Sequence, residues 1–144
     1  MRCVVQRVRS AKVTVDEKTV GSIGQGLLIL CGFLESDTNK NIDWVAKKVA
    51  NLRIFNDEND KLNLSVKDVK GEVLIVSNFT LYGDCTNGSR PNFSLAAKGE
   101  ISKPLYDYFV KKVAEQVAVQ TGKFGKHMEL LLDFNGPITV VIDR

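Results

Sequence analysis

AKVTVDEKTVGSIGQGLLILCGF, residues 11–33, is the stretch of sequence that decides the fold. Its first five residues, Ala11–Val15, alternate between apolar and polar side chains, which is the period of a β-strand with one buried face. The polar turn Asp16–Lys18 allows Thr19–Gly24 to return as the antiparallel partner of a hairpin. Leu27–Phe33 is almost wholly apolar, as is typical of a buried strand. The stretch therefore predicts a β-sheet that begins as a hairpin and continues into the core.

The rest of the chain adds two helices and further strands. Asp37-Thr38 offers an N-cap for an amphipathic helix over Asn39–Leu52. Ser102 and Pro104 open a second helix that reaches about Gln120, where Thr121-Gly122 stops it. Further extended segments are predicted over residues 53–55, 72–77, 128–133 and 138–142, and an irregular loop over 80–99. This order favours an α/β protein, more narrowly α+β, in which two main helices pack on a mostly antiparallel or mixed sheet.

Composition and charge set limits on the function. The 144 residues are 44% hydrophobic, which predicts one domain over residues 1–144 with one core. The longest apolar stretches are strand-sized, well short of the ~20 residues that cross a bilayer, so no membrane partner is expected. The N-terminus is interrupted by charge and does not form a signal peptide, so a cytoplasmic location is expected. A net charge of +3 permits an RNA partner without demonstrating one.

Residues that could hold a metal or run acid–base chemistry are scarce. The three cysteines are widely separated, and His127 is the only histidine, so no metal and no cofactor are expected. The sequence has no G-x-S-x-G elbow, phosphate loop, H-E-x-x-H helix or dinucleotide fingerprint. With one histidine, a Ser-His-Asp arrangement would have to include His127, for which an ordinary structural role is favoured over that of a general base.

Two short segments carry residue types that suit a site. Ser77-Asn78-Phe79-Thr80-Leu81 follows a very hydrophobic strand, where polar groups either meet a ligand or only satisfy the strand end. Asn135-Gly136-Pro137-Ile138-Thr139 lies between the two closing strands, where it is either a plain hairpin turn or a rigid acceptor. A Gly-Pro bond adopts the cis form at modest cost, which directs the neighbouring carbonyls unusually. The residues alone do not decide between the functional and the structural interpretation of either segment.

At these segments the sequence closely resembles the D-aminoacyl-tRNA deacylases, the D-tyrosyl-tRNA deacylase family. The similarity runs from end to end in an ordered set of motifs: Gln6-Arg7-Val8, Arg53-Ile54-Phe55, Leu62-Asn63-Leu64-Ser65, Ser77-Asn78-Phe79-Thr80, Arg90-Pro91-Asn92-Phe93-Ser94, Leu105-Tyr106-Asp107-Tyr108-Phe109-Val110, Thr121-Gly122-Lys123-Phe124-Gly125 and Gly136-Pro137-Ile138-Thr139. Two positions depart from the family pattern. Asn78 stands where Gln is usual, and Phe134 stands where Asn usually precedes the Gly-Pro by two residues.

The resemblance implies a deacylase-like fold whose sheet closes toward a barrel, and an enzyme that hydrolyses the ester of D-aminoacyl-tRNA during translation proofreading. It implies a homodimer with active sites at the subunit interface, each binding the 3′-terminal adenosine of tRNA. A Gly-cisPro motif would reject L-aminoacyl-tRNA, and glycyl-tRNA, which has no side chain to reject, would also be a substrate. The implied catalytic residues are Ser77, Phe79 and Thr80, and the implied substrate-binding residues are Arg7, Asn78, Phe124, Met128, Gly136 and Pro137.

Within that family mechanism, backbone N–H groups near Phe79 stabilise the oxyanion. Thr80 ranks higher as a residue that shapes the pocket than as a nucleophile, because the sequence supplies no adjacent base. Three other functions compete with this interpretation: a noncatalytic RNA-binding module, a small-molecule hydrolase that uses Thr80, and a structural β-protein.

Overall fold

The computed structural model describes residues 1–144 and is organised around its first strand, β1 (Arg2–Val15). The first half of β1 pairs antiparallel with β3 (Gly26–Gly32), and the second half with β2 (Lys18–Ile23). The C-terminal strand β8 (Glu129–Asp143) runs antiparallel along nearly the whole of β1. The predicted hairpin and buried strand are therefore present, and β1 joins them to the end of the chain.

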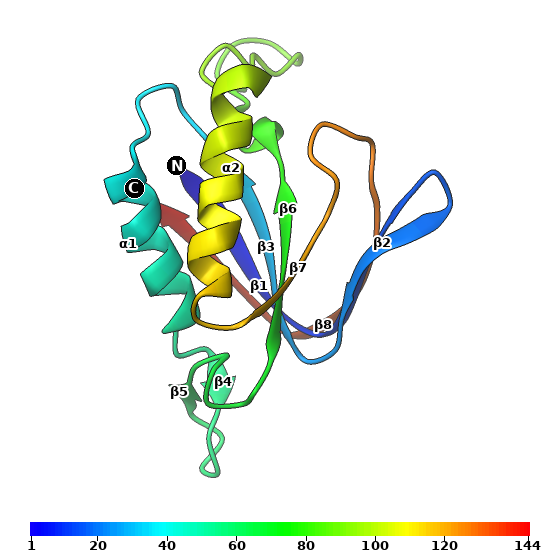
Figure 1. Cartoon of the computed structure of the whole chain (residues 1–144), viewed down its shortest axis with the longest axis vertical. Coiled ribbons are helices and arrows are strands. Elements are labelled where there is room, and N and C mark those ends of the chain that lie inside the picture. Colours follow the sequence, from blue (N-terminus) through cyan, green and yellow to red (C-terminus); the bar gives the residue numbers. More distant parts are fainter.

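The second part of the sheet is parallel. From β3 the chain passes through α1 (Asn39–Ala50) to β6 (Glu72–Ser77), which lies parallel to β3. It then passes through α2 (Gly99–Ala114) to β7 (Ala118–Thr121), which lies parallel to β6. Figure 1 shows α1 and α2 beside each other across one face of this six-stranded mixed sheet. Neither helix is long and apolar enough to cross a membrane.

Two smaller elements project from this framework. The short strands β4 (Phe55–Asn56) and β5 (Leu62–Leu64) form a separate antiparallel ribbon after α1, at the bottom of Figure 1. The 3₁₀ helix η1 (Phe79–Tyr82) follows β6. Each of these two elements holds residues of the candidate site.

The central strands are buried on both faces, which explains their unbroken apolar runs. On β3, Leu27 and Ile29 belong to the larger core beneath the helices, whereas Leu28 belongs to a smaller core on the other side of the sheet. On β6, Ile75 faces the helices and Leu74 faces the smaller core. Side chains from β1 and β2 complete the smaller core, so this side of the sheet curls around apolar groups.

The curl nearly closes the sheet into a barrel at a seam between β2 and β7. An added Cβ on Gly21 would lie 2.6 Å from the Thr121 carbonyl oxygen and 3.2 Å from Leu74 Cδ1. Glycine is thus the only residue that lets the β2 backbone approach this closely. The expected mixed sheet closing toward a barrel, with two helices packed on it, is confirmed.

Two predicted boundaries were wrong. The second helix begins at Gly99 rather than near Pro104, and it ends at Ala114 rather than Gln120. Pro104 lies inside the helix, so its ring did not mark the start, and residues 118–121 form the parallel strand β7 instead of the last turn of the helix. The parallel pairing of β7 with β6 at the end of the sheet outweighs the helical spacing that had suggested a longer α2.

The two predicted closing strands are in fact one. β8 is a single strand from Glu129 to Asp143 with an irregularity between Phe134 and Thr139, so Phe134–Pro137 is not a hairpin turn between strands that pair with each other. Both halves pair with β1 instead. The plain-turn interpretation of the Gly-Pro segment is therefore wrong.

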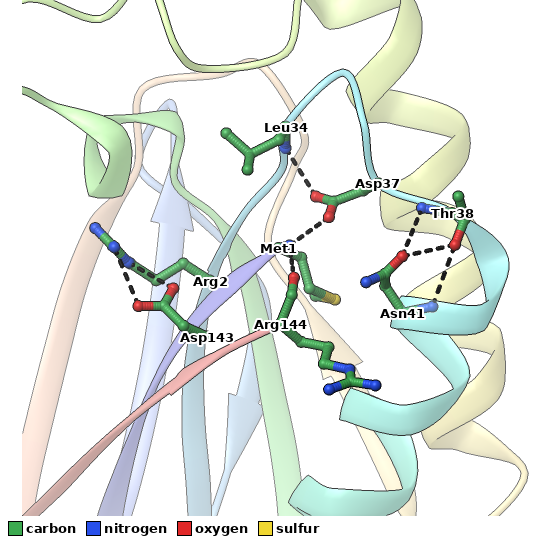
Figure 2. Close-up of polar contacts among 8 residues, drawn as sticks. All are labelled: Met1, Arg2, Leu34, Asp37, Thr38, Asn41, Asp143 and Arg144. Atoms are coloured by element: carbon green, nitrogen blue, oxygen red, sulfur yellow. Dashed lines mark hydrogen bonds and ion pairs between the residues drawn. The ribbon is translucent and has the colours of Figure 1, made fainter.

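The ends of the sheet are tied to the start of α1 (Figure 2). The Met1 ammonium group donates to the Asp37 carboxylate and to the Arg144 carbonyl oxygen, and it is fully buried. Asp37 Oδ2 also accepts the Leu34 N–H at 2.8 Å. Thr38 caps α1 in a reciprocal capping box with Asn41, which confirms the predicted start of this helix.

Candidate functional site

The C-terminal end of β6 forms the first part of the site. After Ser77 the chain turns into η1, and Asn78 is its N-cap in an extended conformation. The Asn78 Oδ1 atom accepts the Thr80 N–H at 3.2 Å and the Thr80 hydroxyl at 2.5 Å. This local bonding turns the chain sharply and leaves the Phe79 side chain 58% exposed.

The turn leaves one main-chain donor free. The Thr80 N–H is occupied by Asn78 Oδ1, and the Asn78 N–H donates to the Cys31 carbonyl oxygen at 2.8 Å. Phe79 is the first residue of η1, where an N–H has no acceptor within the helix, and no turn, loop or cap hydrogen bond includes its N–H. An unpaired N–H beside a cavity is a ready donor for a ligand oxygen.

A cavity of about 840 Å³ opens beside this turn. It lies between η1 and the segment that precedes β8, and most of its lining residues are hydrophobic. Phe79 packs edge-on against Phe93 with ring centroids 5.3 Å apart, which forms one aromatic wall. Six of the residues predicted for the site line the cavity together: Ser77, Asn78, Phe79, Thr80, Phe124 and Met128.

The opposite wall is set by packing around Phe124 and Met128. The Phe124 ring lies 5.4 Å from the Tyr106 ring of α2, whose hydroxyl donates to the Ile75 carbonyl oxygen at 3.0 Å. Met128 Sδ lies so close to Gly122 that an added Cβ there would approach it to 2.6 Å. Phe124 packs against the larger core and Met128 against the smaller core, so contacts with the core hold both side chains.

The cavity has few groups capable of acid–base chemistry. No aspartate or glutamate lines it. Burial raises the pKa of the Cys31 thiol well above its usual range, which keeps this group neutral and unreactive. Thr80 donates its hydroxyl proton to an amide oxygen, which is not a base able to activate a nucleophile. His127 and Lys126 also line the cavity, although the sequence favoured an ordinary structural role for His127.

No group of three or more metal-binding side chains is present in the chain. The arrangement therefore suits a reaction that depends on main-chain hydrogen-bond donors and on a ligand held between aromatic walls.

Arg7, Gly136 and Pro137 lie outside this cavity and form a second cluster. The β1–β8 register pairs Gln6 with Thr139 but Val8 with Phe134, so the intervening part of β8 loops out opposite Arg7. Gly136 has φ 139°, and the Gly136–Pro137 bond is cis. An added Cβ on Gly136 would lie 2.5 Å from the Ile138 nitrogen, so only glycine fits this backbone.

Arg7 fastens the looped-out segment. Its side chain is 7% exposed, and Nε donates to the Asn135 carbonyl oxygen at 2.9 Å. Nη1 donates to the Ile54 carbonyl oxygen at 2.8 Å and to Asn56 Oδ1 at 2.5 Å. Arg9 adds a bond of 2.9 Å to the Phe134 carbonyl oxygen. The segment is thus braced although Phe134 offers no polar side chain, and sequence reasoning missed the contribution of Asn56.

The family model and the sequence relatives agree on one family. The family model described as D-Tyr-tRNA(Tyr) deacylase matches residues 4–143. A D-aminoacyl-tRNA deacylase of Clostridioides difficile is 54% identical over 144 residues, covering 99% of this chain and 97% of the relative. One from Thermotoga petrophila is also 54% identical over 144 residues, with the same coverage of both chains.

Two solved structures share the architecture. One, described as a c-Myc DNA Unwinding Element Binding Protein, has a TM-score of 0.94 at 35% identity and covers 100% of this chain and 99% of its own. The other, described as a probable eukaryotic D-amino acid tRNA deacylase, has a TM-score of 0.86 at 19% identity, covers 99% of this chain and 98% of its own, and shows the fold alone.

Proposed function

This chain belongs to the D-Tyr-tRNA(Tyr) deacylase family and hydrolyses D-aminoacyl-tRNA, and from that premise we propose that main-chain atoms carry both the cleavage and the selection of the ester. The observation that supports this mechanism is the pairing of a free Phe79 N–H with a cavity that lacks any carboxylate. With so few acid–base groups available, preorganised donors are the strongest catalytic resource of the site.

The cavity is proposed to bind the 3′-terminal adenosine of the tRNA. Its volume, about 840 Å³, falls within the range of pockets that enclose small ligands. Aromatic side chains such as Phe79, Phe93 and Phe124 line it, and stacking of a base on an aromatic ring contributes about 1–3 kcal/mol. Lys126 at the rim adds a positive charge for the RNA backbone.

The chemical step is hydrolysis of the ester at the strand end. Water attacks the ester carbonyl carbon, and the resulting oxyanion accepts a hydrogen bond from the Phe79 N–H. The C–O bond to the terminal ribose then breaks, and the proton lost by the water passes to the departing ribose oxygen. The neighbouring ribose hydroxyl assists the attacking water, which accounts for the lack of a protein base. A single oxyanion donor of this kind contributes about 3–4 kcal/mol.

Selection of the mirror image is proposed to come from the Gly136–Pro137 segment of a second subunit. Within one chain this segment does not line the cavity, which supports the proposal that a partner subunit supplies it. Main-chain carbonyls there would hold the substrate ammonium group, so that an L side chain collides with the backbone while a D side chain points outward. Glycine, which lacks a side chain, would escape this rejection, so glycyl-tRNA is proposed as a further substrate.

The outer face of β8 is the proposed dimer contact. Leu131 is 69% exposed, Val141 59% and Phe134 41%, which is unusual for large apolar side chains on one strand of a monomer. We further propose that residues 1–144 act as one domain in the cytoplasm.

The test is deacylation of matched D- and L-aminoacyl-tRNA by the purified protein without added metal. The D ester should be cleaved and the L ester spared, and EDTA should leave the rate unchanged. The variant Gly136→Ala should lose chiral discrimination, because its backbone cannot keep φ 139° without strain. Equal rates on both esters with the unmodified protein would refute the selection mechanism.

A further inference from the structure

We propose that Asn56, on the β4–β5 ribbon, is a positioning residue for chiral selection, because it holds Arg7 in the orientation that holds the Gly136–Pro137 segment. This inference rests on the proposed role of that segment as the chiral filter. Asn56 lies outside the cavity and does not touch Gly136 or Pro137 through any hydrogen bond. It would act only through Arg7.

A continuous chain of hydrogen bonds connects the ribbon to the segment. Asn56 Nδ2 donates to Asp60 Oδ1 at 2.5 Å and to the Asp60 carbonyl oxygen at 3.3 Å. These bonds orient the amide so that Asn56 Oδ1 accepts from Arg7 Nη1 at 2.5 Å. Arg7 Nε then donates to the Asn135 carbonyl oxygen at 2.9 Å, directly before Gly136. The amide of Asn56 is thus the link between the ribbon and the filter.

Arg7 depends on this link because it is a buried cation that forms no ion pair with a carboxylate. No salt bridge in the chain includes Arg7, and its guanidinium is held by carbonyl and amide oxygens alone. A guanidinium donates in a rigid planar fork, so its direction is set by where those acceptors lie. Two acceptors belong to the ribbon side, Ile54 and Asn56, and the others belong to Asn135.

The ribbon is itself well ordered, so it can serve as a fixed anchor. Asp57 Oδ1 accepts the N–H groups of Asn59 at 2.8 Å and of Lys61 at 3.1 Å, and these bonds lower the pKa of Asp57. Asn63 Nδ2 donates to Asp57 Oδ2 at 2.9 Å and closes the turn. None of these bonds reaches Arg7, and the turn keeps its main-chain bonds from Asp57 N to Lys61 O (2.8 Å) and from Asp60 N to Asp57 O (3.0 Å) without the Asn63 side chain, which makes Asn63 a matched control for Asn56.

The experiment compares D and L deacylation rates for Asn56→Ala, Asp60→Ala, Asn63→Ala and Gly136→Ala under single-turnover conditions. For Asn56→Ala the ratio of D to L rates should fall about tenfold, the factor that one lost hydrogen bond to a charged group represents. Asp60→Ala should give a smaller fall, because Asn56 keeps its contact with Arg7 but loses its orientation. Asn63→Ala should keep the wild-type ratio.

The readout separates positioning from stability, because a variant that only unfolds more easily loses D and L activity together and keeps their ratio. An unchanged ratio in Asn56→Ala, alongside a reduced ratio in Gly136→Ala, would overturn the inference and leave the filter intact. An unchanged ratio in Gly136→Ala would instead refute the proposed filter itself. Asp60 lies in an exposed turn, so its variant keeps the test decisive if Asn56→Ala fails to fold.

Discussion

Asn78 directs its side chain back onto its own turn, where the oxygen accepts both the N–H and the hydroxyl of Thr80. Gln, the residue that the family pattern carries here, has a longer side chain. The shorter amide of this protein caps η1 at the edge of the cavity that Asn78 lines, and its expected role in direct substrate binding stays a prediction. This contact favours a pocket-shaping role for Thr80 over that of a nucleophile, because its hydroxyl faces an amide and not a base.

Replacement of Thr80 by alanine tests that role. The variant Thr80→Ala keeps the main-chain N–H and loses one side-chain hydrogen bond, worth about 0.5–1.5 kcal/mol, so the deacylation rate should fall by no more than about tenfold. Loss of a true nucleophile would lower the rate by a factor on the order of 10⁶. Single-turnover hydrolysis of D-aminoacyl-tRNA distinguishes these outcomes.

Thr86→Ala is the matched control for that experiment. Thr86 makes the same pair of bonds with Asp84 Oδ1, at 2.9 Å from its N–H and 2.7 Å from its hydroxyl, but lies outside the cavity. Its replacement should leave the rate unchanged. A Thr80→Ala variant that keeps the native fold but has no measurable activity would instead support Thr80 as the nucleophile.

At the scale of elements, the seam between β2 and β7 determines how far the sheet closes. Gly21 allows the contact because an added Cβ would meet the Thr121 carbonyl oxygen, a main-chain atom that cannot rotate away. Overpacking of this kind costs about 1–3 kcal/mol. Because the smaller core lies behind the seam, its side chains would have to shift along with it.

The variant Gly21→Ala should therefore lower the free energy of unfolding by about 1–3 kcal/mol, measured as a lower midpoint in urea denaturation. Gly24→Ala is the control at the end of the same hairpin, because an added Cβ there meets nothing within 4 Å. That variant should be neutral or slightly more stable. Identical urea midpoints for the two variants would show that the contact between β2 and β7 accommodates an added methyl group.

The sequence predicted those elements whose pattern is local. The hairpin, the cap of α1 at Thr38 and the strand 72–77 follow from periodicity and capping, and each is present. β7 was missed because four residues carry too little pattern, and its place beside β6 is a long-range pairing. Likewise, no local sequence pattern indicates that Asn56 contacts Arg7, because the two residues are 49 positions apart. Six cavity residues were predicted, and they came from motif resemblance rather than from periodicity.

At the scale of the whole molecule, the proposed enzyme is a dimer whose contact is the outer face of β8. A charge placed on that face would be buried without a partner in the dimer, which strongly disfavours association. Leu131→Glu should therefore give a folded monomer by sedimentation equilibrium, and its D-aminoacyl-tRNA hydrolysis should be nearly lost because no partner completes the site.

Val20→Glu serves as the control, because Val20 is also an apolar side chain exposed on a strand (39%), but it lies on β2 and not on β8. That variant should remain dimeric and active. A monomeric Leu131→Glu protein that retained wild-type rate and chirality would contradict the shared site.

The separation between a chain's cavity and its own Gly136 segment has a genetic consequence. Under the proposed arrangement, each active site is assembled from two copies of the chain. A mutation in the cavity and a mutation in the Gly136 segment, carried by different copies, therefore need not affect the same active site. A copy with a blocked pocket and a copy with a faulty filter, expressed in one cell, would pair to regenerate one intact centre. Two such alleles would complement each other, whereas two pocket lesions together would leave the cell without proofreading.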